Sequence, residues 1–417
     1  MKKLFLSVIA LYIGLLNAFS QDTSHASASY TYKPLSLDEI SLVSSYYTQN
    51  GNHSAVTGGI GTEKVTDISN GLELTFVGQN YRGQKHTLTA GLGIDHHTSA
   101  SSAYVSKTGA SQTGGSRIYP SLNWSMEDGV KGTGYGAGLY YSSEYNYHSF
   151  GVNASFSKKT NNNGEFSAKA NVFIDKVTLI YPSELVPGTT TNNDGGITTY
   201  TTASGRTISV NGEHSSENIP TSPRNTFSTT FSFDQVINKR LQGSITLDGV
   251  AQTGYLSLPF HRVYFTDGTE AVEKLPSNRF KLPVGLRLNY FLGDKIILRS
   301  YYRYYVDNWG IRSHTASLEV PVKITPFFSI APFYRYYTQT AADYFASYAA
   351  HKSTDVYYTS NYAYSALNSS YFGVNFRIAP PKGIFSTYLS TLEIRYGHYT
   401  QTTDLMSDVI SLDFKFK

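Results

Sequence analysis

The chain has 417 residues, among them 35 Tyr, 23 Phe and 35 Gly, and its formal net charge is +4 at pH 7. Cysteine is absent, which excludes disulfides, thiol nucleophiles and thiolate metal sites. The small net charge argues against a nucleic-acid partner. No apolar run after the N-terminus approaches the ~20 residues of a transmembrane helix, so the composition favours short strands and polar loops.

The N-terminus has the features of a cleavable secretory signal peptide. Two lysines precede an apolar run over residues 4–16, and small residues stand before Gln21. We therefore expect residues 1–20 to be removed from the mature protein. Residues 21–38 are rich in Ser and Thr and contain Pro34. They are expected to form a flexible periplasmic extension, with a tether for a partner as the alternative.

Residues 39–417 predict an all-β protein, a transmembrane antiparallel up-and-down β-barrel of about sixteen strands (roughly 14–18). Apolar and polar side chains alternate with a period of two, the pattern of strands with one apolar and one polar face. The expected strands are roughly 39–49, 70–79, 85–95, 116–126, 134–142, 147–158, 165–180, 226–237, 241–254, 279–291, 295–306, 314–324, 327–339, 370–379, 388–399 and 408–417.

The connections between these strands alternate in length. Short ones fall at 79–84, 127–133, 159–164, 238–240, 292–294 and 325–326. Longer ones fall at 51–69, 96–115, 181–225, 262–277, 340–369 and 400–407. Because barrels of this class have short periplasmic turns and long extracellular loops, both chain ends should lie on the periplasmic side.

The last ten residues form the clearest predicted strand. Ile410, Leu412, Phe414 and Phe416 share one parity and should face lipid. A C-terminal strand of this kind resembles the signal read by the barrel-assembly machinery of outer membranes, although Lys417 follows the last aromatic. Tyrosines gather near the expected outer strand ends, and Trp and Phe near the inner ends, as expected for two aromatic girdles in the outer-membrane bilayer.

Several long blocks resemble a known family. They are GNHSAVTGGIGTEKVTDISNG (51–71), GIDHHTSASS (93–102), LSLPFHRVYFTDG (256–268), the stretch 298–345 and LEIRYGHYT (392–400). They look like the Bacteroidetes outer-membrane family called domain of unknown function 3570. The resemblance covers essentially the whole mature chain and implies the outer membrane of a Gram-negative bacterium. It brings no catalytic residue, but members are often encoded near a thioredoxin-like protein and a flavin transferase, which implies a periplasmic redox partner as one alternative.

Alternation also assigns charged side chains to the lumen. The later strands supply Arg287, Arg299, Arg303, Glu319, Lys323, Arg335, Arg377, Glu393 and Arg395, and the earlier strands supply Glu73, Asp175 and Asp248. One wall is thus expected to be basic and the opposite wall acidic. Such a field favours small polar or anionic solutes. In the alternative, the charges pair between neighbouring strands and only stiffen the barrel, with Glu319 beside Arg303 and Arg335.

The sequence therefore predicts a porin-like channel or transport component without a cofactor, a metal ion or catalytic residues. One alternative is an interaction barrel that holds a periplasmic redox protein or a surface protein. The other is an outer-membrane hydrolase, for which His53 and Ser54 have suitable residue types.

Three further motifs favour ordinary structure over chemistry. The glycines at 58–61 and 132–136 could pass for phosphate-cradling loops, but no helix follows them, so turns and close packing are expected. Residues 54–62 are expected to form an outer loop rather than a constriction. Residues 95–97 are expected to be a solvated loop rather than a metal site, because neighbouring strand residues point to opposite faces.

Overall fold

The computed structural model describes residues 31–98, 115–182, 185, 190–191, 197–201, 207–211 and 220–417. The expected signal peptide, and the extension up to residue 30, lie outside the described residues. Among the residues described, no helix has the length and hydropathy needed to cross a membrane.

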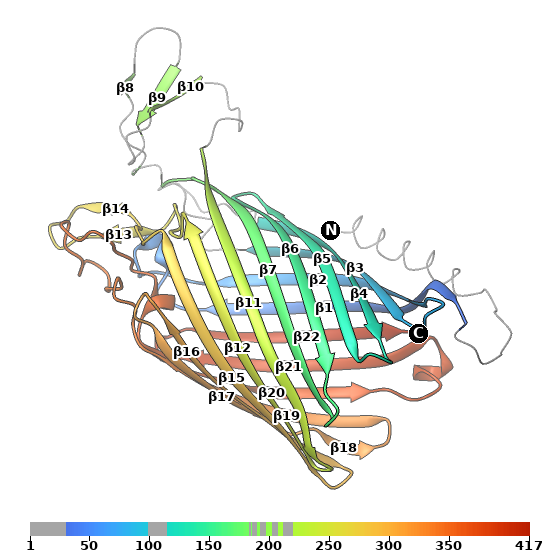
Figure 1. The fold of residues 1–417 in the computed structure, drawn as a ribbon. Helices are drawn as coiled ribbons and strands as arrows, with labels where there is room; N and C mark the ends of the chain where they lie inside the picture. The colour runs from blue at the N-terminus through green and yellow to red at the C-terminus, as the bar shows by residue number, and fades with distance from the viewer. Residues whose placement is uncertain are drawn as a thin grey trace.

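The chain forms one closed antiparallel β-barrel (Figure 1). Its strands are β1 (Lys33–Asn50), β2 (Val65–Gln79), β3 (Lys85–Thr98), β4 (Gly115–Asp128), β5 (Thr133–Glu144), β6 (Tyr147–Lys159), β7 (Gly164–Thr178), β11 (Thr221–Asn238), β12 (Leu241–Gly254), β15 (Asn278–Leu292), β16 (Ile296–Asp307), β17 (Arg312–Glu319), β18 (Val322–Thr325), β19 (Phe328–Gln339), β20 (Leu367–Ile378), β21 (Leu389–Gln401) and β22 (Met406–Phe416). Each pairs with the next, and β1 closes the ring on β22. Because β17 and β18 together occupy one strand position in the ring, the barrel has sixteen strand positions, which confirms the predicted number.

Several predicted boundaries were wrong. Strand β2 begins at Val65 rather than at residue 70, β11 begins at Thr221 rather than at residue 226, and β3 ends at Thr98 rather than at residue 95. The expected strand 314–324 is broken into β17 and β18, because Pro321 between them has no N–H to donate to a ladder. The first strand begins at Lys33 rather than at residue 39. Pro34 does not prevent this, because it falls where the register between β1 and β2 is interrupted.

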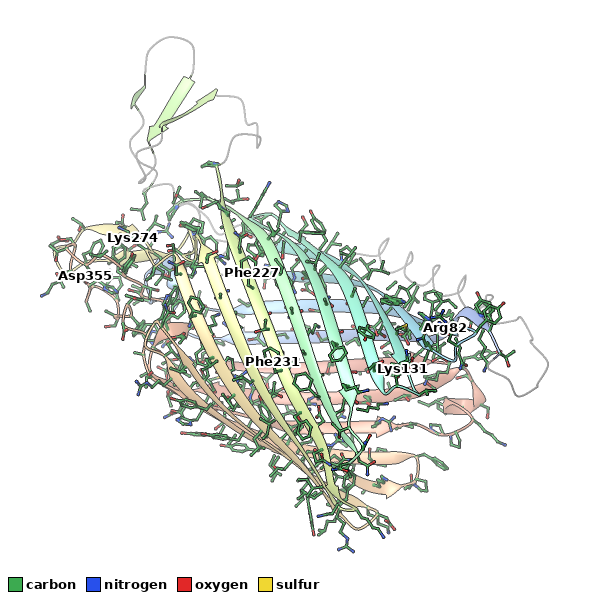
Figure 2. The ribbon with its side chains drawn as sticks, in the orientation of Figure 1. Arg82, Lys131, Phe227, Phe231, Lys274 and Asp355 are labelled. Atoms are coloured by element: carbon green, nitrogen blue, oxygen red, sulfur yellow. The ribbon has the colours of Figure 1, made fainter. Side chains whose placement is uncertain are left out.

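Side chains alternate between an apolar outer face and a polar inner face. On β15, Leu282, Val284 and Leu286 are exposed on the outer face, and Figure 2 shows Phe227 and Phe231 on the wall of the barrel. The polar face is the concave one. Side chains converge on the inside of a curved sheet, and polar side chains on this face touch across an intervening strand. Asn153 on β6 donates to Asn123 on β4 at 3.3 Å. The apolar exterior identifies a barrel that spans a membrane.

The closing strand behaves as predicted except at its end. Ile410 is exposed on the outer face, opposite Tyr46 of β1. Phe416, expected to face lipid, is instead buried at 7% exposure. It pairs with buried Ile40, and the N–H of Lys417 is bonded to Tyr388 O at 3.0 Å, so the inner end of this strand is covered by protein.

The long connections 51–64, 255–277 and 340–366 pack together into one body, which we call the outer cap. It contains the 3-10 helices η2 (Ala55–Thr57) and η5 (Tyr362–Tyr364) and a hairpin of β13 (Arg262–Tyr264) and β14 (Glu270–Val272). Figure 2 shows Lys274 and Asp355 of the cap at one end of the barrel and Arg82 and Lys131 in turns at the other. A separate small sheet, β8 (Thr190–Thr191), β9 (Ile197–Thr201) and β10 (Thr207–Asn211), follows β7.

Contacts between distant segments hold the cap together. Arg262 donates to Val56 O at 2.7 Å, and the His53 ring stacks on Tyr362 with centroids 3.8 Å apart. Gly59 has φ of 88°, and a Cβ there would lie 2.6 Å from Ser360 O. The glycine motif at 58–61 therefore permits a left-handed turn and a close approach, as expected. Residues 54–62 form an outer loop, but one packed against other loops.

The cap is fastened to the inner rim of the barrel mouth. Gln49 donates to Glu63 O at 3.0 Å, Arg224 donates to Tyr255 O at 2.8 Å, and Gln339 donates to Ser365 O at 2.6 Å. All three donors have the parity of the concave face. The cap loops therefore turn inward over the mouth instead of extending away from it.

Candidate functional site

The strongest candidate site is the concave wall formed by β15 to β21. Along each strand, the basic residues proposed for this wall alternate with the exposed apolar side chains and therefore lie on the concave face. Arg287 comes from β15, Arg299 and Arg303 from β16, Lys323 from β18, Arg335 from β19, Arg377 from β20 and Arg395 from β21, with Glu319 from β17 and Glu393 from β21. The wall is therefore assembled from consecutive strands, with its guanidinium groups held at the pleat spacing.

The wall on the other side of the ring is made of small side chains. Strands β4, β5 and β6 stand half the ring away from β17, β19 and β20. Their concave face carries Ser121, Ser125, Gly134, Gly136, Gly138, Ser155 and Ser157, with charged side chains such as Arg117, Glu127 and Glu144 nearer the strand ends. Long arginine and tyrosine side chains of β15 to β21 thus stand across the ring from strands whose middle positions carry small side chains. The acidic residues predicted for the opposite wall, Glu73, Asp175 and Asp248, lie instead on β2, β7 and β12. The glycine–serine surface was not predicted, although the alternation of Gly and Ser could have shown it.

Only some of the basic side chains are paired. Glu319 accepts from Arg299 at 2.8 Å and lies 3.7 Å from Arg395. Arg377 donates to Glu393 at 3.0 Å. The expectation that Glu319 would lie beside Arg303 was wrong, because the register sets Glu319 directly opposite Arg299. Arg335 is a diagonal neighbour of Glu319, but no ion pair within 4.0 Å joins these two side chains.

Arg287, Arg303 and Arg335 are left without a counter-charge. Among the described residues, no carboxylate lies within 4.0 Å of any of them. The Arg287 guanidinium lies 5.6 Å from the Tyr301 ring centre, and that of Arg335 lies 4.9 Å from the Tyr371 ring centre. Aromatic faces therefore hold two of these cations without neutralising them.

The acidic candidates lie apart from these arginines and mostly have neutral partners. Asp175 is buried and accepts a hydrogen bond from Tyr147. Asp248 accepts from Thr230 at 2.6 Å. Glu73 has the concave parity on β2, directly opposite Gly91 of β3.

Residues 95–97 lie within strand β3, so the expectation of a solvated loop was wrong. His96 bonds Ser116 at 2.9 Å, while His97 lies 3.3 Å from Glu144. Consecutive histidines thus point to opposite faces, as a strand requires. Arg117 forms an ion pair with Asp95 at 2.5 Å. Within the described ranges, no group of three or more His, Asp or Glu side chains could hold a metal ion.

A cluster around a second cationic side chain, Arg279, lies at the mouth of the barrel and was not predicted from the sequence. Arg279 forms an ion pair with Asp307 at 2.5 Å, and its guanidinium lies 4.4 Å from the Trp309 ring centre. Asp307 also accepts from the backbone N–H of Trp309 and of Ile311, each at 3.0 Å. This carboxylate is fully engaged, so the cluster fastens the turn after β16 to β15.

The hydrolase alternative has no matching geometry. His53 Nδ1 lies 3.0 Å from Gly59 O, and its ring is stacked on Tyr362. Ser54 is 6% exposed, and no hydrogen bond joins its side chain to His53 in the described part of the chain. A buried hydroxyl without a base does not meet the requirement for nucleophilic catalysis.

Comparison with known proteins identifies relatives of the sequence and of the fold. The sequence model described as "Protein of unknown function (DUF3570)" matches residues 73–405. A search of the curated proteins found no match to the sequence. Among solved structures, a bacterial polysaccharide outer membrane secretin is similar with a TM-score of 0.45 and 8% identity, covering 91% of this chain and 98% of that one. OpdQ of Pseudomonas aeruginosa is similar with a TM-score of 0.40 and 9% identity over 91% and 97% of the two chains.

Proposed function

We propose that this chain, which belongs to the family described as protein of unknown function (DUF3570), is a porin-like passive channel that favours small polar and anionic solutes. The proposal places it in the outer membrane of a Gram-negative bacterium, after cleavage of residues 1–20 and insertion by the barrel-assembly machinery. No catalytic residue, cofactor or metal ion is part of this function.

The observation that carries the proposal is the group of three uncompensated arginines on the concave wall. Fixed positive charges beside a low-dielectric wall raise the local concentration of anions and lower that of cations. On the opposite wall, Glu144 of β5 lies 3.3 Å from His97, while small neutral side chains of β4 to β6 fill much of the surface between the strand ends. Paired charges such as Arg377 and Glu393 contribute little, because their fields oppose one another at short range.

The experiment is the reversal potential of the purified protein in a planar bilayer under a KCl gradient. The native channel should be anion-selective, and Arg287→Gln with Arg303→Gln and Arg335→Gln should move the reversal potential towards the cation side. Arg82→Gln, in an exposed turn between β2 and β3, is the matched control and should leave it unchanged. An unchanged reversal potential in the triple variant would refute the proposed selectivity.

The outer cap favours a second candidate, an interaction barrel with a surface partner. The cap is a folded body made from three loops, and four of its large apolar or aromatic side chains are exposed: Ile60, Tyr348, Val356 and Tyr357. Recovery of one stable partner with the native protein, lost with Val356→Asp and Tyr357→Ser, would support this candidate. Recovery that is insensitive to these changes would count against it.

A further inference from the structure

We infer that Arg287, Tyr301 and Arg303 form a binding site for one oxyanion group, the carboxylate or phosphate of a small solute. This inference deepens the proposed function and rests on it, since it gives the favoured anion a defined place on the concave wall. The site lies across two neighbouring strands, β15 and β16.

Register brings the two arginines together. Arg303 of β16 is directly opposite Gly285 of β15, and Arg287 is directly opposite Tyr301. Arg287 and Arg303 are therefore diagonal neighbours on the same face, with Cα atoms about 7–8 Å apart. Side chains as long as arginine reach a common point from this separation.

Tyr301 supplies the base of the site. A Cβ built on Gly285 would lie 3.1 Å from the Tyr301 hydroxyl oxygen, so the phenol leans over the glycine that faces Arg303. The guanidinium of Arg287 lies over the same ring, 5.6 Å from its centre. Placed over this glycine, the hydroxyl can donate a third hydrogen bond to an anion that both arginines hold.

No carboxylate among the described residues forms an ion pair with either arginine of the site. In the described part of the chain, Arg303 Nε and Thr315 Oγ1 are buried without a hydrogen-bond partner, and Thr315 is directly opposite Arg303 on β17. Arg287 also borders a cavity of about 430 Å³ that Glu165 and Asp234 line and that Tyr301 and Arg303 do not. Neither carboxylate lies within 4.0 Å of the Arg287 guanidinium in the described part of the chain. The nearby carboxylate of Glu319 is already bonded to Arg299.

These observations define the class of ligand. Two like charges on diagonal positions repel one another, and an anion between them removes that cost. The guanidinium fork matches the geometry of carboxylate and phosphate oxygens, which accept two parallel hydrogen bonds. Chloride, a single spherical acceptor, cannot use the fork in this way.

The test measures thermal unfolding of the full-length mature protein in detergent, in chloride, phosphate or succinate at equal ionic strength. Phosphate or succinate should raise the unfolding temperature above that in chloride. In the double variant Arg287→Gln with Arg303→Gln, the concentration of phosphate or succinate that gives half of the maximal shift should rise by roughly tenfold or more. Arg377→Gln, which removes a paired arginine from the same wall, should retain the native value. An effect of succinate alone or of phosphate alone supports the site and identifies the oxyanion.

Two results would overturn the site. One is equal unfolding temperatures in chloride, phosphate and succinate, and the other is an undiminished shift in the double variant. Arg303→Lys keeps the charge but removes the fork, so a full shift in this variant would also contradict the geometry. A protein that shows the shift but conducts no ions would refute the channel and leave the site intact. A conducting, anion-selective protein without the shift would refute the site alone.

Discussion

His261 Nδ1 lies 3.4 Å from Glu273 Oε1 in the buried centre of the outer cap, where both side chains are almost inaccessible. Thr359 Oγ1 donates to the same carboxylate at 2.5 Å, and the N–H of Leu258 donates at 2.8 Å. Residues 258, 261, 273 and 359 come from two separate loops. One carboxylate therefore joins the segments that cover the mouth.

This arrangement makes cap stability depend on pH. Burial acts to raise the pKa of Glu273, but His261, Thr359 and the Leu258 N–H outweigh it, and the pKa lies below its ordinary value of 4.5. A lowered carboxyl pKa stabilises the folded cap above pH 4.5, and this stabilisation is lost as the pH falls through the folded-state pKa. Fluorescence of buried Trp309 beside the cap should report loosening in that acid range.

Glu273→Gln should remove this acid dependence. The variant keeps the shape of the side chain but loses the charge-assisted hydrogen bonds, at a cost of about 1.5–3 kcal/mol to the cap. Asp343→Asn, at an exposed position of the cap loop 340–366, is the matched control and should behave as the native protein does. An acid transition unchanged in Glu273→Gln would contradict the assignment.

A charged substitution can test whether the outer face of β15 contacts lipid. Leu286 is 40% exposed and points away from the concave wall. Leu286→Lys should destabilise the barrel by about 2–4 kcal/mol at mid-membrane. The measurement is the urea dependence of unfolding in lipid vesicles, with Leu286→Met as the control. Equal stability of the two variants would show that the register of β15 is wrong.

Gly285→Ser separates folding from binding. Its Cβ would lie 3.1 Å from the Tyr301 hydroxyl, so the phenol must move and Arg287 loses its support. The barrel should assemble normally, while phosphate or succinate should stabilise it less than in the native protein. Gly71→Ser on β2 is the matched control, because a Cβ at Gly71 meets nothing within 4 Å. Similar anion responses of the two variants would argue against the role of Tyr301.

Removing Glu319 should have the opposite effect to removing arginines. Glu319→Gln releases Arg299 and Arg395 from their shared partner. The reversal potential should then move further to the anion side, because two more cations act on the lumen. Asp294→Asn, in the exposed turn between β15 and β16, controls for the change in net charge. A shift of equal size in the control would attribute the effect to the entrance instead of the wall.

Much of this fold could be predicted because a strand has a local period. The alternation that places Leu286 outward and Arg287 inward depends only on backbone geometry, so it is readable in any short window of sequence. Errors arose where the ladder is interrupted, at Pro34 and Pro321, and where β2, β3 and β11 continue into polar stretches without an apolar alternation. The breaks themselves are local, but whether a chain continues beyond them depends on its neighbours.

The cap was beyond prediction for a different reason. Its buried contacts join residues far apart in the chain, such as Arg262 with Val56 and Glu273 with Thr359. Irregular loops have no period, and the order of residues along the chain does not say which loops meet.

By itself, the sequence determined the class of the protein, the strands, and the face on which each charged side chain lies, because these follow from local alternation and from turn composition. Only the tertiary structure decided which charges neutralise one another. Closure and register set Glu319 against Arg299 and Arg395 and leave Arg303 beside Arg287 with no carboxylate. Partner choice depends on strand offset and curvature, which are properties of the closed ring.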